Sequence, residues 1–294
     1  MHLKVIIDFD GTLTAEETQV AALASKSLDT LAGEILHTSR QELAGDYQLT
    51  RTRLLDAPHR YWWEVNGLVA SYCDEGAFIL NTTTLQVMLR ENPLYAETVA
   101  AAFPQAKYDP VVDCSNYLFH RHTAELSPRF RPSARRVLTS LDRHPQRTPL
   151  VLTNSLGDKV RKHLSTLALD FNVLVLGDTR QYEMDPAWQY RFHDPALEGT
   201  CIWRVDEVHS IDLRRPAYYQ ALMREAADGS RLAIIADTFS LPGALPLQLG
   251  LPFFLLRTSY TPAWCAQAVA THPLGTVLDD IAQLPMALDE TQES

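Results

Sequence analysis

The sequence has few of the features that mark secreted proteins, proteins stabilised by a structural metal, or membrane-spanning proteins. Its four cysteines, Cys73, Cys114, Cys201 and Cys265, include no CxxC pair, so we expect neither a disulfide framework nor a zinc site. No stretch approaches the roughly 18 uninterrupted apolar residues that a membrane-spanning helix requires. An acid at position 8 interrupts the first apolar run before a signal peptide could form, and we therefore expect a cytoplasmic protein.

Positive charge is also scarce. The chain carries 26 Lys and Arg against 36 Asp and Glu, which gives a formal net charge of −10. We therefore do not expect the protein to bind nucleic acid through a broad basic face. A pocket can still be locally positive on an acidic protein, so a small anionic molecule remains a possible partner. The sequence does not indicate an oligomeric state.

Enough apolar material is present for a substantial core. The chain has 294 residues, of which 46% are hydrophobic, and this length is that of about two domains. Short apolar runs of strand length are separated by helical patterns, and several of these runs end in polar residues or glycine. We expect strands at residues 3–7, 150–152, 172–176, 232–235 and 253–256, and helices at 133–141, 157–169, 216–227 and 241–250. This alternation predicts an α/β fold with a Rossmann-like, doubly wound parallel sheet.

The first two strands are too far apart for an ordinary connection between a strand and a helix. Residues 16–36, 61–72 and 94–103 are rich in helix formers, so we expect a mainly helical cap domain at 15–132. The α/β core then comprises residues 1–14 and 133–294, with a flap-like hairpin insertion at about 178–213. A basic and aromatic cluster at 51–63 fits either a lid that contacts substrate or a solvated helix face beside an aromatic core.

Polar side chains follow three of the predicted core strands. Asp8 and Asp10 end the first, Thr153 and Asn154 follow the second, and Asp237 follows the fourth. Open α/β sheets bind ligands at the carboxyl ends of their strands, so these side chains should meet there. Converging carboxylates need a positive partner, and oxygen ligands favour Mg²⁺.

The residues after Asp10 have properties that suit an anion site. Gly11 lets the chain turn sharply, and Thr12 offers a hydroxyl and a backbone N–H. The helix that begins near Ser155 directs its N-terminus at the same edge of the sheet, where an anion is favoured.

These motifs resemble those of the haloacid dehalogenase (HAD) superfamily. Residues 6–14 (IIDFDGTLT) resemble its first motif, 152–154 (LTN) its second and 234–237 (IIAD) the start of its fourth. The third motif normally supplies a lysine before a helix, and Arg215 lies at that place, with Lys159 as an alternative cation. The fourth motif normally has a second acid, whereas this chain has Leu241 and Pro242.

The resemblance implies a Mg²⁺-dependent phosphatase that acts on a small phosphorylated metabolite. Asp8 would attack phosphorus to form an aspartyl-phosphate, and Asp10 would act as acid and then as base. Thr153 and Arg215 would stabilise the transferring oxygens, while Gly11, Thr12 and Asn154 would bind substrate. The metal ligands would be Asp8, the Asp10 carbonyl and Asp237. The alternatives are a weakened HAD-like protein that binds a ligand or partner, and a phosphotransferase.

Overall fold

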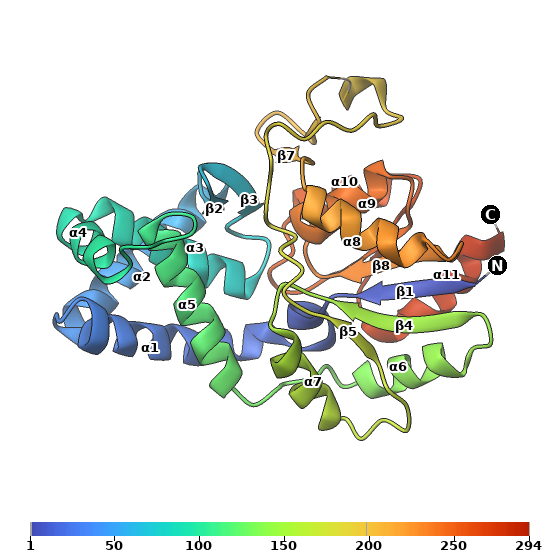
Figure 1. Ribbon diagram of the computed structural model, residues 1–294, viewed down its shortest axis with the longest axis horizontal. Coiled ribbons are helices and arrows are strands. Elements are labelled where there is room, and N and C mark those ends of the chain that lie inside the picture. Colours follow the sequence, from blue (N-terminus) through green and yellow to red (C-terminus); the bar gives the residue numbers. More distant parts are fainter. Residues whose placement is uncertain (1, 198, 294) are drawn as a thin grey trace. The chain divides into compact units, whose positions relative to one another are not determined.

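The computed structural model describes residues 2–197 and 199–293, and the chain divides into two compact units (Figure 1). The core unit comprises residues 1–15 and 128–294, and the insertion unit comprises residues 16–127. The sequence predicts domain boundaries at 14/15 and 132/133, whereas the two units of the structure meet at 15/16 and 127/128. None of the described helices is long and apolar enough to cross a membrane.

A parallel sheet forms the centre of the core unit. Within the described residues it has six strands, in the order β10-β9-β8-β1-β4-β5. Their bounds are β1 Leu3–Ile7, β4 Arg147–Leu152, β5 Leu174–Leu176, β8 Arg231–Ala236, β9 Phe253–Leu256 and β10 Gly275–Leu278. The expected doubly wound α/β sheet is therefore confirmed, with β10 as a strand that the sequence did not indicate.

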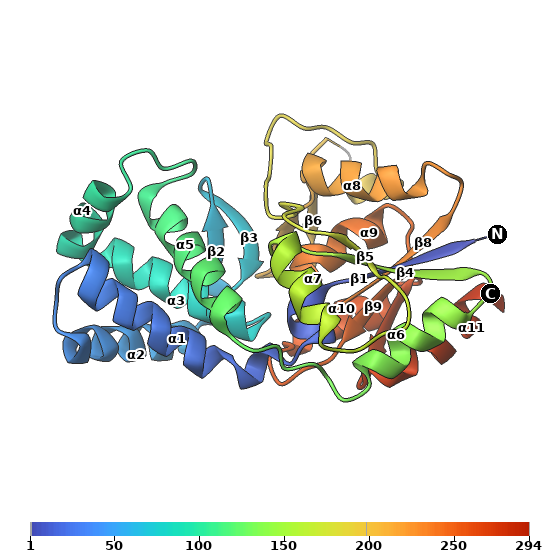
Figure 2. The ribbon, with the colours of Figure 1, turned by 60° about the horizontal axis from the view of Figure 1, so that its bottom comes forward.

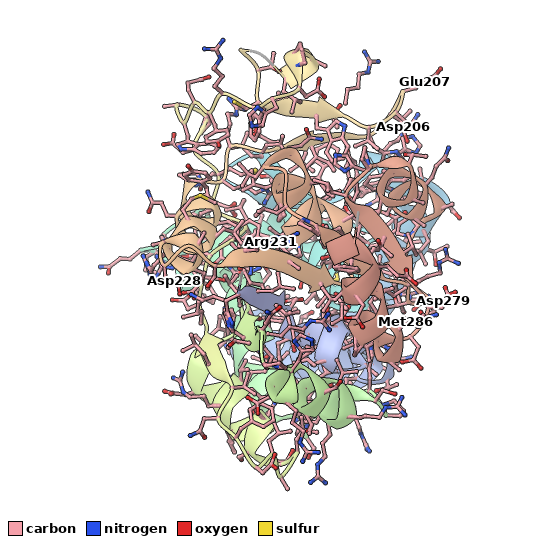
Figure 3. All side chains as sticks on the ribbon, turned by 90° about the vertical axis from the view of Figure 1, so that its right-hand side faces the viewer. Asp206, Glu207, Asp228, Arg231, Asp279 and Met286 are labelled. Atoms are coloured by element: carbon pink, nitrogen blue, oxygen red, sulfur yellow. The ribbon has the colours of Figure 1, made fainter. Side chains whose placement is uncertain are left out.

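Helices cover both faces of this sheet (Figure 2). The hydrophobic cluster on one face takes residues from α6 (Ala134–Arg143), α7 (Gly157–Ser165) and α11 (Leu284–Glu293). The cluster on the other takes residues from α8 (Pro216–Ala226), α9 (Ala244–Gln248) and α10 (Ala263–Thr271). Because side chains alternate along a strand, Val5 and Ile7 join the first cluster and Ile6 the second. Burial on both faces explains why the strands are continuous apolar runs.

The strand order determines where a ligand can bind. β1 lies between β4 and β8, and Ile6 pairs with Leu150 on one side and with Ile234 on the other. The chain passes from β1 to β4 and β5, then continues with β8 on the opposite side of β1. Such a reversal opens a crevice at the carboxyl ends of the strands, where Asp8, Thr153 and Asp237 follow β1, β4 and β8.

The segment after β5 contains the expected hairpin. β6 (Ile202–Arg204) pairs antiparallel with β7 (Ser210–Asp212). Aromatic residues before the hairpin pack against α8, since the Tyr190 ring lies 5.7 Å from Trp188 and 5.1 Å from Tyr219 between ring centroids. These aromatics therefore cover one face of the core.

The insertion unit is mainly helical. Its helices in the described residues are α1 Val20–Thr30, α2 Arg40–Asp56, α3 Ala77–Glu91, α4 Pro93–Ala102 and α5 Pro110–Glu125. Apolar side chains from all five helices form a separate hydrophobic cluster, to which α3 contributes Leu85, Met88 and Leu89. The unit therefore has a core of its own.

The prediction of helical structure at residues 61–72 is wrong. This stretch forms a hairpin of β2 (Trp62–Val65) and β3 (Leu68–Tyr72). Asn66 and Gly67 between the strands have φ values of +54° and +74°, as a two-residue turn with both residues in the left-handed region requires. The Asn-Gly pair and the flanking aromatic and β-branched residues outweigh the helix-forming tendency of the stretch.

The basic and aromatic cluster at 51–63 spans the end of α2 and the start of this hairpin. Arg53 forms an ion pair with Glu91 of α3, and its guanidinium lies 5.8 Å from the centroid of the Tyr61 ring. Its charge is therefore used inside the insertion unit, which favours the solvated face over the lid.

Candidate active site

Asp8 and Asp10 lie at the carboxyl end of β1. The Asp8 N–H donates to the carbonyl oxygen of Ile235 at 3.0 Å, which anchors the end of β1 to β8. Asp8 and Asp10 both have extended backbone conformations, and both side chains are half-buried. Both residues directly follow the carboxyl end of β1, where the crevice of the sheet opens, so both carboxylates can reach it.

Gly11 makes the sharp turn and brings the chain against Asp237. Its φ is +81°, and a Cβ placed there would lie 2.0 Å from Oδ2 of Asp237. A side chain at position 11 would therefore occupy the space of the Asp237 carboxylate. The glycine predicted for its backbone freedom is also required for this close approach.

Thr12 holds Asp237 in place. Its hydroxyl donates to Oδ1 of Asp237 at 3.3 Å and accepts from the Asp237 N–H at 3.0 Å. Both side chains are buried. The Thr12 hydroxyl therefore serves the neighbouring carboxylate, and its predicted contact with substrate stays a prediction.

The surroundings of Asp237 strongly disfavour its charge. Burial raises the pKa of the Asp237 carboxyl well above its ordinary value, and the negative charge of Asp8 raises it further. The positive charge of Arg131 acts in the opposite direction. Arg131 donates from Nε to the Gly11 carbonyl oxygen at 3.0 Å, which fixes this cation beside the turn.

Asp10 forms a small network with α7. The Ser155 hydroxyl donates to Oδ2 of Asp10, and the Lys159 ammonium lies 3.3 Å from Oδ1. Lys159 also donates to the Ser155 hydroxyl at 3.0 Å, and its side chain is only 6% exposed. The structure thus gives the alternative cation, Lys159, a direct contact with the predicted acid–base residue.

Thr153 and Asn154 stabilise the loop that follows β4. Oγ1 of Thr153 accepts from the Ser155 N–H at 3.2 Å, and Oδ1 of Asn154 accepts from the Gln181 N–H at 2.8 Å. A hydroxyl that accepts still has its own hydrogen to donate, and an amide that accepts still has its NH₂ group. Both residues therefore retain donors for a phosphoryl oxygen.

Arg215 is buried at the start of α8. Its Nε donates to the Asp212 carbonyl oxygen at 3.1 Å, and its Nη1 donates to the Gln181 carbonyl oxygen at 3.2 Å. The side chain is only 1% exposed. These bonds fix the guanidinium against the loop that also binds Asn154, so the residue at the place of the family lysine belongs to the same end of the sheet.

The residues at this edge fit a magnesium ion. Asp8 and Asp237 are close enough for each charge to act on the other, and a cation between them would relieve the raised pKa of Asp237. The predicted third ligand is the main-chain carbonyl of Asp10. Across the described residues, no group of three or more His, Cys, Asp or Glu side chains could hold a metal, so this set depends on two carboxylates. Mg²⁺ is commonly bound through one or two carboxylates and several waters.

Arg131 and Ser155 are site residues that the sequence motifs do not include. Arg131 falls at the end of the predicted cap domain, and it reaches the site because Phe130 forms a β-bridge with Thr14. No local pattern indicates such a contact. For Ser155 a signal was present, since it follows Thr153 and Asn154 at the carboxyl end of β4, where the site was expected.

No protein-family model matches this chain, and no curated protein matches it. Similar solved structures include a 2-haloacid dehalogenase from Pseudomonas syringae pv. tomato DC3000, with 18% identity, 99% of this chain and 100% of that chain covered, and a TM-score of 0.48. Another is described as a HAD-hydrolase, YfnB from Bacillus subtilis, bound to magnesium, with 12% identity, 98% and 99% covered, and a TM-score of 0.49.

A third similar structure is a HAD-superfamily hydrolase of subfamily IA, variant 1, from Geobacter sulfurreducens PCA. It shares 14% identity, with 98% of this chain and 96% of that chain covered and a TM-score of 0.45. At these identities no activity transfers to this chain, so its own residues carry the functional assignment.

Proposed function

We propose that the protein is a HAD-type phosphatase that hydrolyses a small phosphoric monoester through an aspartyl-phosphate. The observation that carries this proposal is that the Asp8 and Asp10 carboxylates have different surroundings. The Ser155 hydroxyl and the Lys159 ammonium contact Asp10, and Asp8 lies at the end of β1, near enough to Asp237 for its charge to act on that carboxyl.

Asp8 is the nucleophile in this mechanism. A carboxylate oxygen of Asp8 bonds to phosphorus as the bond from phosphorus to the ester oxygen breaks, and the leaving group departs as an alcohol once protonated. Water then attacks phosphorus, which releases phosphate and restores the carboxylate. Dividing one difficult displacement into two easier ones is the advantage of covalent catalysis.

Asp10 supplies and then removes the protons. In its protonated form it donates to the leaving oxygen, and as a carboxylate it then accepts a proton from the attacking water. Lys159 stabilises the carboxylate form, which is the form required in the second step. A dehalogenation would release halide, which needs no proton, so the network around Asp10 favours phosphoryl transfer over that chemistry.

Cations and donors from other elements bind the transferring group. Arg215 and Lys159 provide positive charge, and Thr153 provides a hydroxyl hydrogen, at the edge where negative charge develops. Mg²⁺, held by Asp8, Asp237 and the Asp10 carbonyl, would supply charge neutralisation for the phosphoryl oxygens.

A second candidate is a HAD-like protein that binds its ligand with little turnover. The observation in its favour is the segment after Asp237, where the buried Leu241 and Pro242 occupy the place of the family's second acid. With one carboxylate fewer, the metal would be held less tightly. Transfer of the phosphoryl group to an acceptor other than water is a third candidate.

The test is hydrolysis of an aryl phosphate by the purified protein with Mg²⁺. We expect Asp8→Asn to abolish turnover and Asp10→Asn to lower it by about a hundredfold or more, since general acid–base catalysis contributes about that much. Asp158→Asn is the matched control, because Asp158 is 97% exposed on α7. Full activity in Asp8→Asn would overturn the mechanism, and an inert wild type that still binds phosphate would favour the binding protein.

A further inference from the structure

Tyr218 is a buried tyrosine with an unpartnered hydroxyl. The residue is 1% exposed, and its hydroxyl oxygen has no hydrogen-bond partner among the residues that the structure describes. A buried hydroxyl without a partner costs folding free energy, whereas phenylalanine would fill almost the same space without that cost. Packing alone therefore does not explain a tyrosine at this position.

Tyr218 lies at the same end of the sheet as the candidate active site. It is the third residue of α8, and Arg215 immediately precedes the helix. The next element after α8 is β8, so the beginning of α8 lies level with the carboxyl ends of the strands. Tyr218 also shares a buried cluster with Ile6 and Ala236, which lie near the ends of β1 and β8.

Two charged groups of the site act on the Tyr218 hydroxyl. Burial raises its pKa well above the ordinary value, the negative charge of Asp8 raises it further, and the positive charge of Arg215 opposes them. Both charged groups are therefore near the hydroxyl, and a phenol hydroxyl can donate a hydrogen bond without carrying a charge. Such a donor suits an anion, because it adds no negative charge beside the carboxylates.

We propose that Tyr218 is a further substrate-binding residue, whose hydroxyl donates a hydrogen bond to an oxygen of the phosphoryl group at Asp8. This inference rests on the proposed function and deepens it. The motif resemblance assigns no role to this position. The orphan donor becomes satisfied when the anion binds, so the folding free energy lost in the free protein returns as affinity.

The test compares Tyr218→Phe with Tyr219→Phe in the full chain. Tyr219 is the matched control, because its hydroxyl bonds with that of Tyr190, on the aromatic cover of α8. The measurements are the Kd of inorganic phosphate in the presence of Mg²⁺, kcat and KM for an aryl phosphate, and the unfolding midpoint without phosphate.

We expect Tyr218→Phe to weaken phosphate binding by about tenfold or more, the usual worth of a hydrogen bond to a charged group. Its unfolding midpoint without phosphate should equal or exceed that of the wild type. Tyr219→Phe should leave phosphate affinity unchanged. Wild-type affinity in Tyr218→Phe would overturn the inference, as would a lower midpoint with unchanged affinity.

The same measurements distinguish this inference from the proposed function. An active wild type that depends on Asp8, together with unchanged affinity in Tyr218→Phe, leaves the phosphatase standing and removes only the role of Tyr218. A wild type that neither binds phosphate nor hydrolyses the ester overturns both.

Discussion

Among single residues, Gly11 carries the tightest constraint in the site. Its positive φ makes the turn after Asp10, and its missing side chain lets the Asp237 carboxylate approach its Cα. Two independent requirements therefore meet at one position. The effects of backbone conformation and of space can be separated, because Gly229 has a similar φ of +82° with nothing within 4 Å of an added Cβ.

We expect Gly11→Ala to destabilise the protein more than Gly229→Ala does, and to abolish the hydrolysis of aryl phosphate. Gly229→Ala should cost about 1–2 kcal/mol, the usual penalty of the left-handed region for a residue with a Cβ. Gly11→Ala must also displace Asp237. Urea unfolding and activity assays measure the two effects, and equal losses of stability would show that the turn alone matters.

The contact of Lys159 with Asp10 makes a second prediction at this scale. We expect Lys159→Met to lower kcat by about a hundredfold, because it removes the cation that stabilises the Asp10 carboxylate. Lys162→Met, an exposed lysine on the same helix, is the control. Wild-type turnover in Lys159→Met would assign the catalytic cation to Arg215 alone.

Among the elements, α7 brings a histidine close to this lysine. Burial lowers the pKa of His163, and the positive charge of Lys159 lowers it further. The centroid of the His163 ring lies 6.1 Å from that of the Phe9 ring, and Phe9 stands between Asp8 and Asp10. The folded protein therefore holds His163 neutral at a pH where an unfolded chain already takes up a proton.

The lowered pKa of His163 makes the folding stability depend on pH. Below the ordinary pKa of about 6.5 the unfolded state binds more protons, so folding stability falls as pH drops toward the lowered pKa. We expect His163→Phe to lose less stability than the wild type between pH 7.5 and pH 5.5. Parallel losses in urea unfolding at the two pH values would contradict this role.

The elements differ in how well sequence predicts them. β1, β4, β8 and β9 are buried on both faces, so continuous apolar residues reveal them. β10 is a short edge strand whose first three residues are half-buried, and its pattern carries little signal. The β2–β3 hairpin has a signal in the sequence, the Asn66-Gly67 pair, but the prediction gave more weight to the helix-forming residues around it.

The residues of the candidate site also differ in how well the sequence predicts them. Asp8, Asp10, Thr153 and Asp237 follow predicted strands, so the sheet alone brings them to one edge. Arg131 depends on a β-bridge between distant segments, and the orphan hydroxyl of Tyr218 depends on the packing of α8. Tertiary contacts of this kind leave no periodic trace in a sequence.

For the molecule as a whole, the decisive feature is how the insertion unit joins the core unit. The chain leaves after Ala15 and returns at Pro128, and the Ala15 N–H donates to the Arg129 carbonyl oxygen at 2.7 Å. Within the insertion unit, the Gln19 side chain donates to the Ser127 carbonyl oxygen at 2.7 Å, so the two ends of the unit are also close together.

We expect the core unit to fold without residues 16–127, replaced by a short Gly/Ser linker. Its two hydrophobic clusters and every assigned site residue lie in the core unit. The shortened protein should unfold cooperatively by circular dichroism and still bind inorganic phosphate with Mg²⁺. Loss of the cooperative transition would show that the insertion unit is needed for the core to fold.

The position of β1 has a consequence for the order of events during synthesis. β1 is made before both of its partners in the sheet, which begin at Arg147 and Arg231. The helices of the insertion unit can form before β1 has a partner. Pairings between segments that are distant in the sequence form late, so this apolar strand stays unpaired during that time. Val5–Ile7 therefore stay unpaired while the chain between β1 and β4 is made, and Asp8 and Asp237 come together only once β8 has been made.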